Sequence, residues 1–262
     1  MRKTRIALIV PSSNTTMEAD FVPRIPHEKA SFHVARMYTG EPATKATEEH
    51  MITVGLPRAL ENIATAEVDL VMFGCTSAGT IHGAGTEREL EELIQRTTHA
   101  KSVTVTRALN TALREHNAKR IIVFSPYGPE LNKSVTDFME SAGFDVIYTK
   151  GMAVMQNQWI AAVEPEEIVK FAMDALHEAD LLVDDGDGTY HLKDGDAIVF
   201  SCTNLRAWEC LEQMQRTIKT YFTSSNKALF DLAMKTAGLL CAMAQCGFLI
   251  PADERSEICV FD

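Results

Sequence analysis

Short apolar runs alternate with longer segments of helical periodicity along most of the chain. Seven runs have the length of a β-strand, and several are rich in Val and Ile with little polar alternation. This pattern is typical of parallel strands that are covered on both faces. The predicted strands are Arg5–Val10, Ser31–Arg36, Leu70–Phe73, Ser102–Thr104, Arg120–Phe124, Asp145–Tyr148 and Ala197–Phe200.

Helical patterns fill the segments between these strands. Between Glu48 and Ala64 the apolar residues recur at close to helical spacing, and Pro165 followed by two glutamates is typical of a helix start. Alternating strand and helix units predict an α/β fold with parallel sheets and right-handed crossovers. The predicted helices are Glu48–Ala64, Thr86–Thr97, Arg107–His116, Glu130–Ser141, Glu166–Glu178 and Leu205–Gln215.

The chain also repeats itself. In the first half, 64 residues separate Pro11 from Cys75, and in the second half 76 residues separate Pro126 from Cys202. The excess of 12 residues matches a turn-rich segment, residues 184–196, which predicts an inserted hairpin. Without that insertion the two halves are in register.

This repeat predicts two similar α/β subdomains with parallel-sheet cores and an active site in the cleft between them. The N-terminal subdomain comprises residues 1–110, and the C-terminal subdomain comprises residues 111–225. A C-terminal helix in residues 226–250 is expected to pack back on the N-terminal subdomain.

The net charge and the length of the apolar runs argue against two classes of binding partner. The net charge of −11 argues against a nucleic acid or an anionic membrane surface, and no run approaches the roughly 18 to 20 apolar residues of a membrane span. The basic N-terminus leads into a short apolar run that ends at Pro11, which favours a first strand over an export signal. We therefore expect a cytoplasmic protein whose six cysteines are reduced, and no cysteine or histidine cluster has the spacing of a zinc site.

Small polar or thiol side chains follow four of the predicted strands. In an open parallel sheet, ligands bind beyond the carboxyl ends of the strands, so we expect these segments to face one cleft. Helices begin there, and their free N–H groups and dipoles favour a bound carboxylate. The four segments, residues 11–16, 74–78, 125–128 and 201–204, contain Asn14, Cys75, Thr76, Ser77, Tyr127, Cys202, Thr203 and Asn204.

Two thiols stand out among these side chains. Cys75 and Cys202 each end an apolar run, and each is followed by threonine. A helix N-terminus is expected to lower the pKa of such a thiol, so that one thiolate and one thiol supply a nucleophile or base and an acid. The residues expected to donate hydrogen bonds to substrate carboxylates or to an enolate-like intermediate are Asn14, Thr76, Thr203 and Tyr127.

Structural roles are the alternative for the same residues. A cysteine at a strand end is often a small buried hydrophobe, which is our interpretation of the other four cysteines. Asn14 could serve only as a helix cap, and Tyr127 could be a turn aromatic between proline and glycine. Arg206 could pair with a substrate carboxylate or lie on a helix surface.

The motif at residues 11–18, Pro-Ser-Ser-Asn-Thr-Thr-Met-Glu, resembles the opening motif of maleate cis-trans isomerases. These enzymes belong to the aspartate/glutamate racemase superfamily, together with arylmalonate decarboxylases and hydantoin racemases. The two half-site cysteines, the turn at residues 125–127 and Asn157 also resemble the isomerase pattern, and the likeness covers most of the chain.

The resemblance implies a fold of two racemase-like lobes and a cofactor-independent isomerase that converts maleate to fumarate. In that family the first cysteine adds to the double bond of the substrate, and Cys75 matches it. Cys202 matches the second cysteine, which handles the proton. The residues that match carboxylate-binding positions are Asn14, Tyr127 and Asn157. The resemblance also implies that no metal, flavin or pyridoxal phosphate takes part, and that the enzyme is a homo-oligomer.

Some segments depart from the isomerase pattern. Residues 76–79 and 202–206 are more similar to the racemases, and the insertion at residues 184–196 is unusual. A racemase of amino acids or hydantoins, in which the two thiols exchange a Cα proton from opposite faces, is therefore the second hypothesis. A malonate-type decarboxylase ranks third because in that relative glycine replaces the first cysteine, whereas Cys75 is present here. A binding protein on the same fold is a further class.

Overall fold

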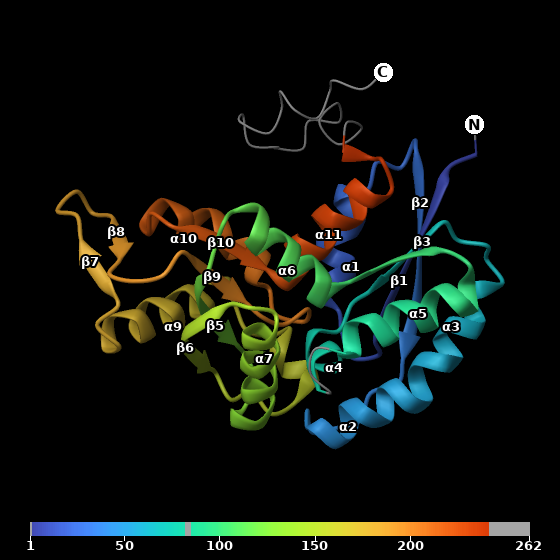
Figure 1. The fold of residues 1–262 in the computed structure, drawn as a ribbon, viewed down its shortest axis with the longest axis horizontal. Coiled ribbons are helices and arrows are strands. Elements are labelled where there is room, and N and C mark those ends of the chain that lie inside the picture. Colours follow the sequence, from blue (N-terminus) through green and yellow to red (C-terminus); the bar gives the residue numbers. More distant parts are fainter. Residues whose placement is uncertain (1, 82–84, 241–262) are drawn as a thin grey trace.

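Two four-stranded parallel sheets form the centre of the protein (Figure 1). The structure is a computed structural model that describes residues 2–81 and 85–240. The first sheet has the order β2-β1-β3-β4, with strands Ala30–Met37, Thr4–Pro11, Leu70–Phe73 and Lys101–Thr104. The second has the order β10-β9-β5-β6, with strands Tyr221–Ser224, Ala197–Phe200, Arg120–Ser125 and Asp145–Gly151.

The two sheets follow one plan. In each, the first strand of the repeat lies between the second and the third, and the fourth lies at an edge, so β5, β6, β9 and β10 correspond to β1, β2, β3 and β4. The predicted α/β class with parallel-sheet cores is confirmed. All seven predicted strands are present, and their bounds differ from the predicted ones by at most three residues.

One strand of the second sheet, β10, was not predicted. β10 is four residues long and ends in Thr223 and Ser224, so it lacks the apolar run that marks most of the other strands. The expected hairpin is present but begins two residues before the predicted segment 184–196: β7 (Leu182–Asp184) pairs antiparallel with β8 (Tyr190–Leu192). In Figure 1 this hairpin projects at the end of the second lobe.

Helices cover the sheets, and their starts are set by the residues that precede them. Thr104 and Ser224 each accept a hydrogen bond from the N–H group three residues later, and Glu164 forms a capping box ahead of Pro165. The helix predicted at residues 205–215 is instead a 3₁₀ turn followed by a shorter α-helix. The helices of the first half are α1 (Thr16–Phe21), α2 (Lys45–His50), a π-helical turn (Met51–Gly55), α3 (Leu56–Ala64), α4 (Thr76–Thr80), α5 (Thr86–Thr98) and α6 (Val105–Glu115). Those of the second half are α7 (Pro129–Ser141), α8 (Asn157–Ile160), α9 (Pro165–Glu178), the 3₁₀ turn Ala207–Cys210, α10 (Leu211–Thr217) and α11 (Ser225–Thr236).

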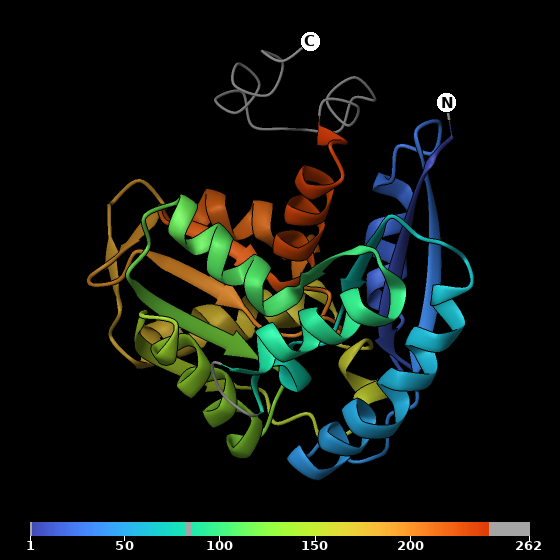
Figure 2. The same cartoon turned by 45° about the vertical axis from the view of Figure 1, so that its right-hand side comes forward.

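The final helix of each half crosses to the other half. α6 follows β4 of the first sheet and also contacts β10, while α11 follows β10 and contacts α1, β3 and β4 (Figure 2). The two helices pack against each other. Of the predicted helix at residues 226–250, the part up to Thr236 is helical, and residues 241–250 lie outside the described residues.

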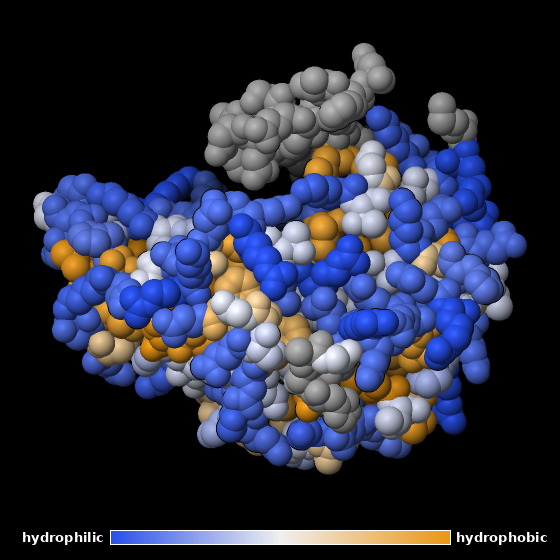
Figure 3. Space-filling view, viewed as in Figure 1, coloured by the Kyte–Doolittle hydropathy of each residue, from blue (hydrophilic) through white to orange (hydrophobic). Residues whose placement is uncertain are grey.

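One hydrophobic core runs through both lobes. It includes Leu8 and Met72 from the first sheet, Phe124 and Phe200 from the second, and Phe230 from α11. The face seen in Figure 3 is mainly hydrophilic, with hydrophobic areas between the charged side chains. Within the described ranges, no helix has the length and apolar character that crossing a membrane requires.

Candidate active site

The two cysteines leave the sheets at equivalent positions. Cys75 follows β3 and is the N-cap residue of α4, and Cys202 follows β9 after one residue. Since β3 pairs with β1 and β9 pairs with β5, both thiols emerge beside the loops that follow those strands. Both are free thiols and both are buried, with 4% of Cys75 and 5% of Cys202 exposed.

Hydrogen bonds join the two cysteine loops. The Thr203 hydroxyl donates to the carbonyl oxygen of Gly74 at 3.1 Å and accepts from the Asn14 amide at 3.2 Å. Asn14 Oδ1 in turn accepts from the N–H groups of Thr16 and Met17, both at 3.1 Å, which caps the start of α1. Asn14 is therefore both a cap and a link from the first lobe to the residue after Cys202.

Tyr127 lies beside Cys202 in the buried part of the site. Tyr127 is 5% exposed, and hydrogen bonding from its side chain lowers the pKa of the Cys202 thiol. Burial raises the pKa of Tyr127 well above 10, and the neighbouring Cys202 and Cys75 raise it further. The phenol therefore keeps its proton at neutral pH and can donate a hydrogen bond there.

Both thiols have raised pKa values, so the prediction that helix starts lower them was wrong. Burial raises the pKa of Cys202 to about 11, and it raises the pKa of Cys75 well above 9. Hydrogen bonds from the N–H groups of Asn204 and Leu205 do lower the pKa of Cys202, and that of Ala78 lowers the pKa of Cys75. Loss of hydration outweighs these bonds, so both resting thiols are protonated.

Glu48 contacts the Cys75 thiol, and the sequence analysis missed it. The thiol donates a hydrogen bond to Glu48 Oε2 at 3.4 Å, and the Ser77 hydroxyl lies 3.6 Å from the same sulfur. Glu48 is 4% exposed; burial raises its pKa, while hydrogen bonds with Cys75 and Ser77 lower it. The helical spacing of the sequence could have indicated that Glu48 is buried. Glu48 lies three positions before the buried Met51 and therefore on the same helical face.

The Thr76 side chain is held by a contact with the opposite half of the chain. Its hydroxyl is 2.9 Å from the hydroxyl of Ser225, the first residue of α11. Both residues are buried. Thr76 therefore links α4, the helix that begins after Cys75, to a helix that arrives from the second lobe.

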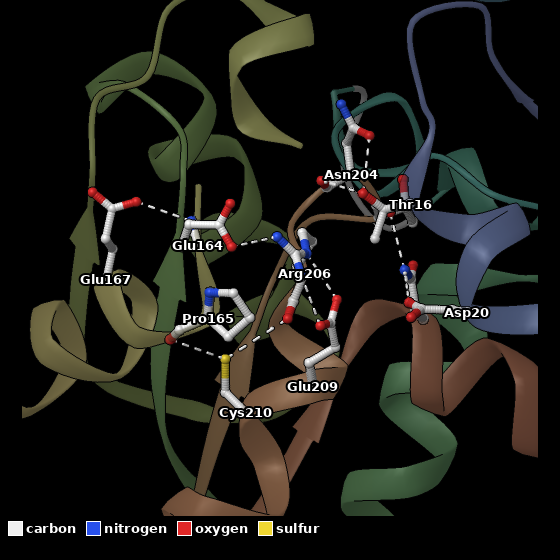
Figure 4. A network of polar contacts seen from close by, with 11 residues as sticks. Thr16, Asp20, Glu164, Pro165, Glu167, Asn204, Arg206, Glu209 and Cys210 are labelled. Carbon is white, nitrogen blue, oxygen red and sulfur yellow. Dashed lines mark hydrogen bonds and ion pairs between the residues drawn. The ribbon is translucent and has the colours of Figure 1, made fainter. Parts of the chain in front are cut away.

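Asn204 links segments from both lobes with one side chain (Figure 4). Its Oδ1 accepts from the Thr15 N–H at 3.1 Å and from the Thr16 hydroxyl at 3.3 Å. Its amide donates to the carbonyl oxygen of Asn157 at 2.7 Å, and its own N–H donates to Cys202 Sγ at 3.3 Å. This residue therefore fixes the loop after Cys202 from three directions.

Asn157 lies where two loops from different lobes meet. Its amide donates to the carbonyl oxygen of Gly40 at 3.3 Å, and its N–H donates to Glu41 Oε2 at 3.1 Å. The N–H of Ala43 also donates to the carbonyl oxygen of Met155 at 3.1 Å. Hydrogen bonds therefore join the loop after β2 to the loop after β6, and the Asn157 side chain lies between these loops.

Arg206 is paired with glutamates of the second lobe. It forms ion pairs with Glu164 at 2.7 Å and with Glu209 at 2.8 Å (Figure 4). Its guanidinium is thus occupied by two carboxylates. In residues 2–81 and 85–240, no group of three His, Cys, Asp or Glu side chains is arranged to hold a metal ion.

Comparison with known proteins places the chain in a family. The family model described as arylmalonate decarboxylase matches residues 8–250. A maleate isomerase from Pseudomonas putida is 30% identical over 175 residues, which cover 63% of this chain and 69% of the relative. A maleate isomerase from Alcaligenes faecalis is 26% identical over 190 residues, 68% of this chain and 74% of the relative. The chain belongs to the arylmalonate decarboxylase family.

Solved structures share the fold of this family member. A Nocardia farcinica maleate cis-trans isomerase variant with a covalently bound succinylcysteine intermediate superimposes with a TM-score of 0.78 and 22% identity, over 91% of this chain and 94% of that chain. Arylmalonate decarboxylase itself gives a TM-score of 0.69 and 18% identity, over 89% and 92% of the two chains. The predicted relationship to maleate isomerases and arylmalonate decarboxylases is confirmed.

Proposed function

We propose that the protein is a cofactor-independent cis-trans isomerase that converts maleate to fumarate. The observation that carries the proposal is the pair of buried thiols, Cys75 and Cys202, at equivalent strand ends and both near Tyr127. The two curated relatives described above are maleate isomerases. The succinylcysteine of the Nocardia farcinica enzyme is the product that a thiol forms when it adds across the double bond of maleate.

In the proposed reaction Cys75 is the nucleophile. The S–H bond of Cys75 breaks first, with its proton passing to a base in the site. The thiolate sulfur then forms a bond to one alkene carbon, and the π electrons move onto the neighbouring carbon and its carboxylate. Cys202 gives its proton to that neighbouring carbon. The adduct is a succinyl group on Cys75 whose central carbon–carbon bond is now single and free to rotate.

Rotation and elimination complete the reaction. After the carbon–carbon bond has turned, the Cys202 thiolate takes a proton from the carbon that it protonated before. The carbon–sulfur bond breaks, its electron pair returns to Cys75, and fumarate leaves. The Tyr127 hydroxyl donates to Cys202 Sγ, and this bond lowers the pKa of the Cys202 thiol, so it stabilises the thiolate between the two proton transfers.

Neutral donors are proposed to hold the substrate carboxylates. The assigned residues are Asn14, Thr76, Ser77, Tyr127, Asn157, Thr203 and Asn204. Asn14 supports this because only one of its two amide hydrogens is used by Thr203. Thr76 and Asn157 already have partners, so each must exchange a hydrogen bond within the protein for one to the substrate.

Turnover of maleate tests the proposal. Purified protein is incubated with maleate near neutral pH, and fumarate is followed by proton NMR. We expect fumarate to form with the wild type, and we expect Cys75→Ala and Cys202→Ala to lose at least about a hundredfold in rate. A wild type that forms no fumarate would reject maleate as the substrate, and alanine variants that keep full activity would reject both thiol roles.

Deuterium exchange distinguishes the racemase hypothesis from the proposed isomerase. In heavy water a two-thiol racemase introduces deuterium at the Cα of an amino acid or hydantoin, whereas the proposed isomerase needs an alkene and leaves those compounds unlabelled. Exchange at Cα without conversion of maleate would favour the racemase.

The proposal includes a cytoplasmic homo-oligomer. Both thiols must stay reduced to act, which fits a reducing compartment. Sedimentation velocity of the purified protein measures the oligomeric state, and a monomer at all concentrations would contradict this part.

A further inference from the structure

The Cys75 thiol donates a hydrogen bond to a buried carboxylate. Its sulfur donates to Glu48 Oε2 at 3.4 Å, and both side chains are only 4% exposed. Glu48 lies in α2 of the first lobe, 27 positions before the cysteine, so the contact is made by the fold and not by the local sequence. α2 and α4, the helix that begins after Cys75, pack against each other.

Nothing positive balances this carboxylate in the described part of the chain. No ion pair to Glu48 occurs there, and its two hydrogen-bond partners are the Cys75 thiol and the Ser77 hydroxyl. A buried carboxylate without a cation is costly, and glutamine would fill nearly the same space and could still accept a hydrogen bond through its carbonyl oxygen without that cost. What distinguishes glutamate from glutamine at this place is the ability to take a proton.

We propose that Glu48 is the catalytic base of Cys75, accepting the Sγ proton before addition and returning it after elimination. In its catalytic part the inference rests on the proposed function. The S–H bond breaks and an O–H bond forms on Glu48, which leaves a thiolate beside a neutral carboxylic acid. The thiolate adds to the alkene, and when the carbon–sulfur bond later breaks, the sulfur recovers the proton from Glu48.

This route is favoured because the net charge of the Glu48–Cys75 pair does not change. The pair carries one negative charge before the transfer, on Glu48, and one after it, on Cys75. Release of the thiol proton to water would instead put two negative charges side by side in a buried site, which is why the Glu48 charge raises the pKa of Cys75. A neutral Glu48 also leaves the dianionic substrate facing one protein charge and not two.

Among the residues that the structure describes, few titratable groups neighbour the pair. Tyr127 and Cys202 feel the charge of Glu48, and both have raised pKa values and stay protonated at neutral pH. Ser77 does not titrate in this range. The proton that Cys75 gives up therefore has one acceptor among the described side chains that contact its sulfur.

Alkylation of Cys75 tests the proton transfer in the free protein. The probe is iodoacetamide, and the product is quantified by mass spectrometry on the tryptic peptide of residues 59–88, in which Cys75 is the only cysteine. In the wild type the thiolate arises inside the pair, so the alkylation rate should be nearly independent of pH between about pH 7 and 9. In Glu48→Gln the thiolate arises only by loss of a proton to water, so the rate should rise roughly tenfold per pH unit.

Two further variants complete the test. Glu49→Gln makes the same chemical change at the next position of α2 and should keep the flat profile. Glu48→Asp keeps a carboxylate and should restore a flat profile at a lower rate. The proposal is overturned if the wild-type rate climbs tenfold per pH unit, or if the profile of Glu48→Gln is flat; the wild type and Glu48→Asp decide it even if Glu48→Gln does not fold.

Turnover provides the second readout. With maleate as substrate, Glu48→Gln should lose about a hundredfold in kcat at pH 7, and the deficit should shrink as pH rises. An equal loss at every pH would mean a structural role and would overturn the proposal. If the wild type does not convert maleate at all, the proposed function fails, while the alkylation profiles still decide the role of Glu48.

Discussion

Tyr127 shows at the scale of one residue how burial sets the chemistry of this site. A phenol in water and a thiol in water both titrate above neutral pH, and burial moves Tyr127 and Cys202 further in that direction. The hydrogen bond between them acts oppositely on the two groups, since it favours a thiolate on Cys202 and a proton on Tyr127. The pair is therefore suited to forming one thiolate transiently.

Removal of the phenol hydroxyl tests this pairing. Tyr127→Phe keeps the buried ring but removes the donor to Cys202, so the pKa of Cys202 should rise above about 11. We expect kcat for maleate to fall by roughly ten- to a hundredfold, with unfolding free energy changed by about 1 kcal/mol or less. Tyr148→Phe, at a half-buried position on β6, is the matched control and should keep its activity. Unchanged kcat in Tyr127→Phe would refute the role.

The sequence predicted which residues lie in the candidate site better than it predicted their protonation states. The strand-end position of Cys75 and Cys202 was visible in the apolar runs, and the structure places both there. Their pKa values were predicted in the wrong direction because the helix start is readable from sequence, whereas the depth of burial depends on the packing of both lobes. Glu48 was missed because its partner lies 27 residues away and only the fold joins them.

At the scale of elements, α11 connects the two lobes to the site. Its first residues Ser225 and Asn226 bind Thr76 and the carbonyl oxygen of Thr203, one residue beyond each cysteine. Asn226 also donates to Asp20 of α1 at 2.7 Å. The strand that leads into α11 escaped prediction, although its pairing with β9 is regular. Only two of its residues, Tyr221 and Phe222, are apolar.

Asp20 makes stability depend on pH. It is 4% exposed, and burial raises its pKa from 3.8 to about 6 although Asn226 lowers it. The unfolded chain therefore ionises first, so the contribution of Asp20 is complete below about pH 4 and is lost as pH rises through about 6. We expect urea titrations to show that the stability of the wild type relative to Asp20→Asn declines by up to about 3 kcal/mol over this range.

The control for this prediction is Asp137→Asn, which removes a carboxylate from an exposed surface of α7. Its stability relative to the wild type should change by less than about 1 kcal/mol over the same pH range. A constant difference between the wild type and Asp20→Asn from pH 4 to pH 7 would show that Asp20 does not titrate differently on folding.

An aromatic cluster holds α11 against both lobes. Phe230 packs at 5.2 Å from Phe21 of α1 and at 5.7 Å from Trp208, measured between ring centroids. Phe230→Ala should cost about 3 to 5 kcal/mol of unfolding free energy because the side chain is fully buried. Phe171→Ala, at a half-buried position on α9, is the control and should cost less. If urea titrations show that the two variants lose the same unfolding free energy, Phe230 has no special role in holding α11 against the lobes.

At the scale of the whole molecule, the repeat explains why the candidate site draws residues from both halves of the chain. Each half supplies one cysteine from the third strand of its sheet, and each half sends its last helix across to the other. The matched spacing of the two cysteines predicted the first of these features. For the second feature, we expected only that a C-terminal helix would return to the N-terminal subdomain, where α11 contacts α1, β3 and β4. The crossing of α6 was not expected, because the destination of a helix depends on which apolar face is left uncovered by the other lobe.

The central claim is that Cys75 forms a covalent bond to the substrate while Cys202 handles the proton. Incubation of Cys202→Ser with maleate tests it most directly, since water can protonate the adduct but no thiolate remains to remove that proton. Intact-mass measurement should show a gain of one maleic acid per chain, and peptide mapping should place it on residues 59–88, with Cys75 as the only cysteine in that peptide. The absence of an adduct, or an adduct that persists when Cys75 is also replaced by alanine, would contradict the account.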